Sequence, residues 1–195
     1  AFLFLCASSY AGVTAAAIEN TAAATFLPLD ARKQVLKINL TADSVDTLTG
    51  FRVINSLACD EPGDISSVRL YYQPSGGFFD AGTAVFVAVL QRVAAKTWEN
   101  TSLNFAVSNG SALYVVVDIA ASPKDGNTFK AKLSAGSIVF QAGGGFPSNV
   151  VNNQFTQTIL NPGYLLASAI DYMTQKADRG QSDIRAMKLK LVNTL

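Results

Sequence analysis

The sequence predicts a mainly β protein, built as an antiparallel sandwich or barrel. From residue 34 to about 160, short runs of alternating apolar and polar residues follow one another, which is the period of a half-buried strand. Turn-forming residues separate these runs, in EPGD (61–64), QPSGG (73–77), SNG (108–110), SPKDGN (122–127) and AGGGFP (142–147). At 195 residues the chain is long enough to bury one sizeable core.

Nine strands are expected from this pattern. The first, at 34–41, places Leu36, Ile38 and Leu40 on one face and polar residues on the other. The run at 112–120 is apolar on both faces, which is typical of a central strand. The other expected strands are 49–55, 66–73, 84–92, 102–107, 128–134, 137–141 and 154–160. The glycines of AGGGFP indicate a flexible joint after the penultimate strand.

The N-terminal segment differs from the middle of the chain. It begins AFLFLCASSYAGV and has no charged side chain before Glu19. Alanine is frequent up to residue 25, so we expect a helix from about 2 to 26, with an extended strand as the alternative for AFLFL. A secretory signal peptide has a similar apolar stretch, but the basic residues that precede such a stretch are missing, and we expect the segment to be retained.

The C-terminal segment predicts a helix followed by a strand. Asn161 is a candidate N-cap, Pro162 suits the first helical position, and Gly180 suits the end. Alternation at 187–191 then predicts a strand, which would pair with its own sheet or with another chain. The expected organisation is an assembly segment at 1–29, a β-sandwich domain at 30–160 and a C-terminal extension at 161–195.

The composition favours an exported or heavily covered protein. Apolar residues make up 49% and charged residues only 15%, with a mean hydropathy of +0.25. The net charge is +1 and no basic cluster exceeds Arg32-Lys33, which argues against nucleic-acid binding. Residues 1–18 contain polar side chains and make a marginal membrane span, so we expect membrane contact before assembly at most. The expected location is extracellular, at the cell surface.

The middle of the chain resembles a known module type. The pieces that carry the resemblance are the strand DISSVRLYY, the apolar strand ending in VDIA and the turn DGNTF. Together they look like the immunoglobulin-like modules of bacterial and archaeal surface proteins, similar to the module that precedes the propeller of BNR-repeat sialidases. The resemblance covers about 34–141 and neither terminus. It implies an immunoglobulin-like sandwich and no catalytic residues, because the sialidase active site would lie in a propeller.

Catalytic and metal-binding chemistry is not expected. The chain has no histidine, which removes the common triads and histidine metal sites. Asp60, Glu61 and Asp64 could supply an acid pair, and Asp60, Asp64 and Asp80 a calcium site, but carboxylates at turns more often bond nearby backbone. The alternating spacing of a calcium loop is absent. We therefore expect no enzyme activity, no metal and no cofactor.

Modification sites are a separate expectation. The sequons at Asn39, Asn100 and Asn109 fall on an outward strand position, a loop and a turn, where glycans could stand. Cys6 and Cys59 could form one disulfide, within or between chains, or remain unpaired.

The apolar N-terminal segment leads to the functional hypothesis. The middle strands suffice to close a core, so a spare apolar segment would bind copies of the same chain as a structural subunit of an extracellular filament or pilus. The predicted interface residues are Phe2, Leu3, Phe4, Leu5, Tyr10, Val13 and Ile18. The alternative is a carbohydrate-binding or spacer module of a cell-surface glycosidase or adhesin that contacts surface glycans. Its candidate stacking platform comprises Tyr71, Tyr72, Phe78, Phe79 and Trp98, although strand aromatics more often pack in the core.

Overall fold

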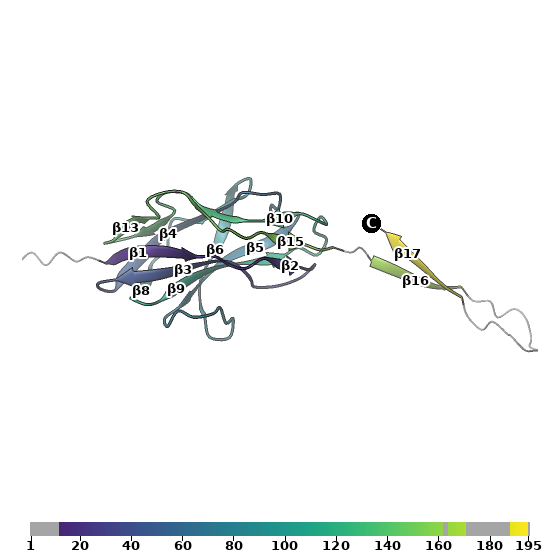
Figure 1. The fold of residues 1–195 in the computed structure, drawn as a ribbon, viewed down its shortest axis with the longest axis horizontal. Coiled ribbons are helices and arrows are strands. Elements are labelled where there is room, and N and C mark those ends of the chain that lie inside the picture. The colour runs from purple at the N-terminus through teal and green to yellow at the C-terminus, as the bar shows by residue number, and fades with distance from the viewer. Residues whose placement is uncertain (1–11, 162–163, 171–187, 195) are drawn as a thin grey trace, which may run out of the picture. The chain divides into compact units, whose positions relative to one another are not determined.

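The computed structural model describes residues 12–161, 164–170 and 188–194. The chain divides into two compact units, Ala1–Asn161 and Pro162–Leu195, and each is treated by itself. All regular secondary structure in the described ranges is β (Figure 1). The mainly β prediction is therefore confirmed.

The first unit is built on one 12-stranded antiparallel sheet that bends round on itself. Its main path runs β1-β3-β9-β5-β6-β7-β4-β11-β14, with β12, β13 and β8 attached beside it. The strands are β1 Val13–Glu19, β3 Lys33–Ala42, β4 Asp46–Asn55, β5 Ile65–Gln73, β6 Val85–Ala94, β7 Thr97–Asn100, β8 Phe105–Val107, β9 Ala112–Ile119, β11 Ala131–Leu133, β12 Ile138–Phe140, β13 Gly144–Phe146 and β14 Val151–Asn152. Because β6 pairs with β5 on one edge and with β7 on the other, it joins the two layers into a near-barrel.

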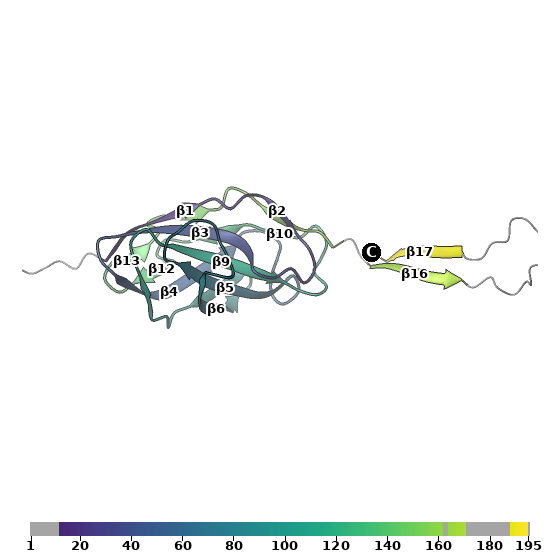
Figure 2. The same ribbon diagram turned by 90° about the horizontal axis from the view of Figure 1, so that it is seen from below.

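A small second sheet closes one end of this unit. It comprises β10 Thr128–Phe129, β15 Gln157–Ile159 and β2 Ala24–Phe26, in the order β10-β15-β2. The β15–β2 pair is parallel. Figures 1 and 2 both place β2 and β10 at the end of the unit opposite β13.

The core lies between the layers and follows the predicted alternation. Leu36, Ile38 and Leu40 are buried, and so are Phe129, Ala131 and Leu133 of the run at 128–134. Every residue of β9 is buried, which confirms its prediction as a central strand. Trp98 is fully buried against Phe129. The short strands β7, β13 and β14 were not predicted, since runs of two to four residues carry too little alternation.

The predicted N-terminal helix is wrong for residues 13–26, which form β1 and β2. β1 pairs with β3 from Val13 opposite Ala42 to Glu19 opposite Lys37. The Lys37 ammonium also donates to the Glu19 carboxylate at 2.6 Å. Pairing along the edge of a sheet thus outweighs the helix preference of the alanines. Residues 1–11 lie outside the described residues.

The second unit is described as a hairpin of two strands. β16 Tyr164–Ile170 pairs antiparallel with β17 Lys188–Thr194, from Tyr164 opposite Thr194 to Ile170 opposite Lys188. The predicted helix from 161 is therefore wrong over 164–170, and the rest of it falls outside the described residues. The predicted strand is confirmed over 188–191. No helix long and apolar enough to cross a membrane occurs in the part of the chain that the structure describes.

Candidate assembly surface

Strand β6 is the most apolar exposed element of the first unit. Four of its side chains remain open to solvent, namely Val85 (45% exposed), Phe86 (50%), Val89 (38%) and Val93 (52%). Only Leu90 is fully buried in the core. A contiguous apolar strand that keeps this much side chain in water is typical of an interaction surface.

One edge of β6 is also incompletely paired. Val85–Leu90 pairs with β5, from Tyr72 opposite Val85 to Val68 opposite Leu90. On the other edge, β7 pairs only with the later residues of β6, from Gln91 to Ala94. Among the described residues no strand pairs with the second edge of Val85–Leu90, which we call the free β6 edge. Figure 2 shows β6 beside β5 on the lower side of the unit.

The loop at 74–84 explains why the apolar surface extends beyond β6. It folds over the outer face of β5 and β9, where Phe79 packs against Tyr71 and Tyr114 at ring distances of 5.4 Å. The Tyr114 hydroxyl donates to the Gly77 carbonyl at 2.8 Å and holds the loop down. Phe86 of β6 also contacts Tyr71, at a ring distance of 5.6 Å. The cluster of Phe79, Tyr71 and Tyr114 therefore continues onto β6. Phe78 is 92% exposed on the same loop.

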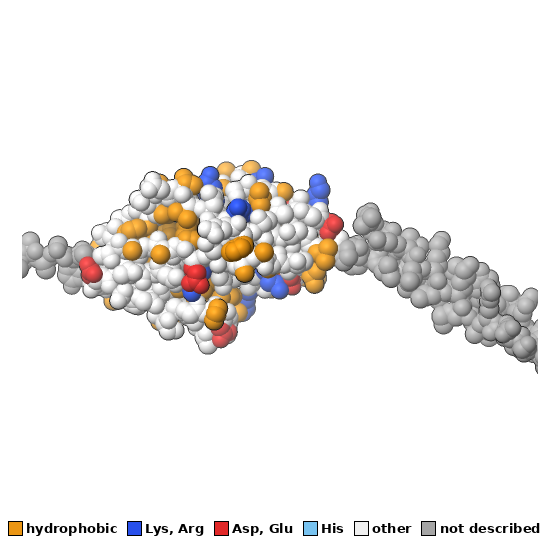
Figure 3. Space-filling view, viewed as in Figure 1, with side chains coloured by type: hydrophobic (Ala, Val, Ile, Leu, Met, Phe, Trp, Pro, Cys, Tyr) orange, Lys and Arg blue, Asp and Glu red, His pale blue; other side chains and the backbone are white. Residues whose placement is uncertain are grey.

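Charge is almost absent from the free β6 edge. Val85–Leu90 contains no charged residue and no proline, two of the features that commonly keep edge strands from pairing with other chains. A third such feature, a β-bulge, is present at Val87 in the pairing with β5. The nearest ion pairs on neighbouring positions are Arg69 with Asp118 at 2.7 Å and Arg92 with Asp60 at 2.8 Å. On the face seen in Figure 3, charged side chains are few and scattered among apolar and uncharged polar ones.

The entry of the chain into β1 is held by one buried carboxylate. Asp46 accepts hydrogen bonds from the backbone N–H groups of Val13, Thr47, Ala142 and Gly143 at 2.7–3.0 Å. Burial acts to raise the pKa of Asp46, but these four donors outweigh it and the pKa is lowered. The segment 142–147 is therefore fixed to the domain, and its β13 pairs with β12, so the predicted flexible joint is wrong.

The predicted interface residues divide into two groups. Val13 is buried in the core of its own domain, and Ile18 packs against that core, so both serve the fold. Phe2, Leu3, Phe4, Leu5 and Tyr10 lie outside the described residues. The candidate assembly segment, which was predicted at 1–29, is therefore shortened to residues 1–11. Sequence reasoning missed the free β6 edge because an alternating strand looks the same whether its edges are paired or open.

The candidate acid pair is engaged in loop structure. Asp60 accepts from the Arg92 guanidinium at 2.8 and 3.1 Å and from the Lys96 N–H at 2.9 Å. These bonds, the Arg92 side chain first, lower the pKa of Asp60 to about 2. Glu61 accepts from the Trp98 indole N–H at 2.6 Å. Asp64 accepts from the Lys124 N–H and the Asn127 amide at 2.9 and 2.8 Å.

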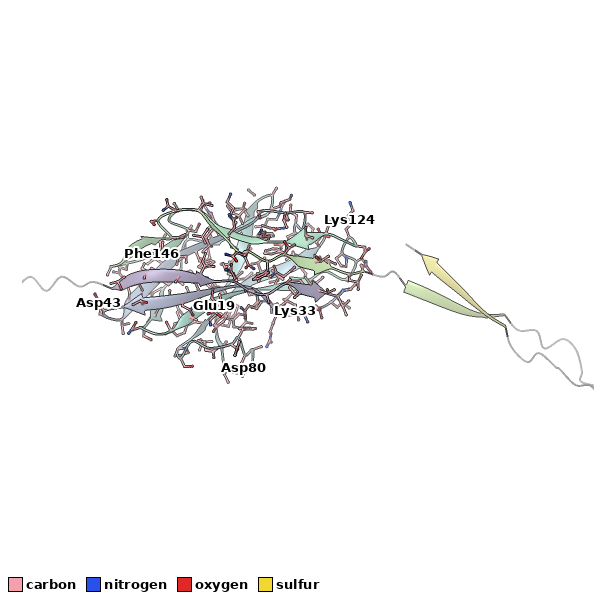
Figure 4. All side chains as sticks on the ribbon, viewed as in Figure 1. Glu19, Lys33, Asp43, Asp80, Lys124 and Phe146 are labelled. Atoms are coloured by element: carbon pink, nitrogen blue, oxygen red, sulfur yellow. The ribbon has the colours of Figure 1, made fainter. Side chains whose placement is uncertain are left out.

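The candidate calcium ligands are not brought together. Asp80 binds within its own turn, to the Gly82 N–H at 2.8 Å and the Thr83 hydroxyl at 3.2 Å. Figure 4 labels Asp80 and Lys124, the backbone partner of Asp64, at well separated places on the unit. No three acidic, histidine or cysteine side chains among the described residues are placed to hold a metal ion.

The candidate sugar platform is not assembled either. Trp98, Tyr71 and Tyr72 are buried, Phe79 packs against Tyr71, and only Phe78 stands free. A small cleft of about 160 Å³ lies beside the Arg52–Glu99 ion pair, with Ser137 in its lining. This volume is below the roughly 300 Å³ at which ligand pockets begin. The aromatic ring in its lining, Phe51, is only 2% exposed and offers no stacking face.

The sequon asparagines differ in what their amides do. The Asn39 amide nitrogen, the atom that would carry a glycan, donates to Glu19 at 2.9 Å. In Asn100 and Asn109 the carbonyl oxygens accept instead, from the N–H groups of Ser102 and Ala42. Asn100 and Asn109 are therefore better placed than Asn39 to carry a glycan.

Cys59 is buried and makes no disulfide within the described residues, while Cys6 lies outside them. Burial raises the pKa of the Cys59 thiol to about 12, and the nearby Asp64 carboxylate acts in the same direction. Cys59 is thus held as an unreactive thiol.

Comparison with known proteins does not place this chain in a family: no family matches the sequence, and no curated protein matches it.

Proposed function

We propose that this chain is a structural subunit of an extracellular filament or pilus, which polymerises through its apolar N-terminal segment. The observation that carries the proposal is strand β6, which keeps four large apolar side chains exposed and, among the described residues, has no partner on the second edge of Val85–Leu90. Such a surface is stabilised when another chain covers it.

The described residues form a core by themselves. The buried cluster among them runs from Val13 to Ile159. Burial of a large apolar side chain contributes roughly 1.5–3 kcal/mol, so Phe2, Leu3, Phe4 and Leu5 together could contribute on the order of 6–12 kcal/mol. This is comparable with the roughly 4–15 kcal/mol that association costs. The segment is therefore suited to joining subunits.

The shape of such a contact favours a polymer. An apolar segment at one place and a receiving strand at another make a heterologous contact, which repeats from copy to copy. The low charge of the chain, its sequons and its likeness to immunoglobulin-like surface modules support an extracellular location. The alternative, a glycan-binding or spacer module, shares that location and fold type, but the aromatic residues expected to form its stacking platform are mostly buried or packed against one another.

Deletion of residues 1–11 tests the proposal. Because β1 begins at Val13, this deletion leaves every described strand in place, whereas deletion through residue 26 would also remove β1 and β2. We expect full-length protein to form regular filaments in negative-stain microscopy, and the 1–11 deletion to remain a folded monomer by sedimentation and circular dichroism. Filaments that persist after this deletion would contradict the proposal.

The second candidate function gives a different result in the same samples. A glycan-binding module would stay monomeric with and without residues 1–11, and both forms would bind a glycan array equally.

A further inference from the structure

We infer that the free β6 edge is the receiving site for residues Phe2–Leu5 of a neighbouring copy, which add to it as an antiparallel strand. The inference rests on the proposed function and deepens it, because it names the surface on the partner that the apolar segment binds.

The backbone of the free β6 edge is suited to strand addition. Val85–Leu90 offers N–H and C=O groups on an edge where no described strand pairs with it. Added strands gain affinity from these main-chain bonds and specificity from alternate side chains. Every other pair in this sheet is antiparallel, and antiparallel pairing is slightly the more stable per residue. The six residues of Val85–Leu90 are enough to pair with all four residues of Phe2–Leu5.

The side chains around the edge match the chemistry of the segment. Val85, Phe86 and Val89 are exposed and apolar, and Phe86 leads to Tyr71 on the outer face. Phe2, Leu3, Phe4 and Leu5 are apolar at every position, so both faces of the added strand would carry apolar side chains. No charge in Val85–Leu90 would be left unpaired by this burial.

The terminal strand β1 is a poorer receiver. β1 ends the sheet path, but its exposed residues are Thr14, Ala15, Ala17 and Glu19. Alanine offers little area to bury, and the Glu19 carboxylate with its Lys37 partner would lose water.

A neighbouring copy follows from the proposed function, in which the apolar segment joins subunits. Links formed between chains, as opposed to links within one chain, distinguish it from the same copy.

Disulfide trapping tests the site, with Cys6 as the natural probe next to Leu5. Val85→Cys and Val89→Cys each place a thiol beside the free β6 edge, and Val45→Cys is the matched control at an exposed valine away from it. Buried Cys59 does not compete. After oxidation of assembled full-length protein, we expect a ladder of linked chains for the β6 variants, with the Cys6 link to position 85 or 89 found by mass spectrometry. Cys6→Ser should abolish it.

A charge variant gives a second, independent measurement. Val89→Lys should raise the concentration needed for polymerisation at least tenfold, while Val45→Lys should leave it unchanged and both variants should keep the wild-type fold. Links within a single chain at position 85 or 89, links between chains that form equally at position 45, or normal polymers of the Val89→Lys variant would each overturn the site. If wild-type protein forms no polymer at all, the proposed function fails and the site fails with it; polymers that ignore β6 overturn the site alone.

Discussion

Asp60 holds two parts of the chain together that are far apart in sequence. Its carboxylate receives the guanidinium of Arg92, on β6, and the N–H of Lys96, in the turn that follows. The side chain is partly shielded, with 27% exposure beside Arg92 at 39%. A charge pair of this kind stabilises the folded state only while the carboxylate is ionised.

We therefore predict a pH-dependent effect of Asp60→Asn. The folded pKa of Asp60, about 2, lies below the ordinary value of 3.8, so its stabilisation is present above about pH 4 and is lost as the pH falls through about 2. At neutral pH the variant should lose about 1–2 kcal/mol of unfolding free energy, allowing for solvent screening. Chemical denaturation at several pH values should show the loss shrinking toward pH 2.

Asp80→Asn is the control for this prediction. Its carboxylate binds only within its own turn among the described residues, and no guanidinium contacts it there. Its loss should be smaller, about 0.5 kcal/mol, at neutral pH. A loss for Asp60→Asn that stays constant down to pH 2 would contradict the assignment.

These residue roles were only partly predictable. The sequence predicted that turn carboxylates bond nearby backbone, and Asp60, Asp64 and Asp80 all do so. The Arg92 partner of Asp60 was not predictable, because it lies 32 residues away and depends on how β6 passes the loop. The same holds for Glu61, whose partner Trp98 is reached only in the folded chain.

At the scale of elements, the start of β1 at Val13 and the segment 142–147 are bound to each other through Asp46. Gly143 comes so close to β1 that a Cβ atom at this position would lie 2.2 Å from the Val13 carbonyl oxygen. Only a glycine allows this approach, because the neighbouring atom is backbone and cannot turn aside.

We predict that Gly143→Ala loosens the start of β1. The clash should cost about 2 kcal/mol or more of unfolding free energy and increase hydrogen exchange at Val13. Gly63→Ala is the matched control, since nothing lies within 4 Å of a Cβ built there. If both variants unfold at the same denaturant concentration, the close approach at Gly143 does not matter for stability.

Elements were predictable where alternation extended over several residues. The long strands β3, β5, β6 and β9 fall within two residues of their predicted ranges. The helices expected at 2–26 and 161–180 were wrong wherever the structure describes those ranges, because the alanines of 15–17 and the residues of 164–170 pair with other strands. Helix preference is local, whereas pairing depends on a partner elsewhere in the chain.

For the whole molecule, the sequence predicted the fold class better than it predicted which apolar side chains are exposed at the surface. A β core was expected from alternation, and most residues of that core are apolar members of the predicted strands, whereas Val13, Phe26, Cys59 and Trp98 lie outside them. Which apolar residues would be left outside was not predictable, since Leu90 and Val89 are equally apolar in sequence but only Leu90 is buried. That difference depends on how β6 turns between two layers.

The proposed polymer should therefore respond to salt in the manner of an apolar contact. Charged residues make up only 15% of the chain, and none lies in Phe2–Leu5 or Val85–Leu90. Screening between about 0.05 and 0.5 M NaCl weakens exposed charge pairs but not apolar burial, so the concentration needed for polymerisation should change less than about twofold. Light scattering across this range measures it. A polymer held by ion pairs would instead dissolve as salt rises, and that result would refute an apolar joint between subunits.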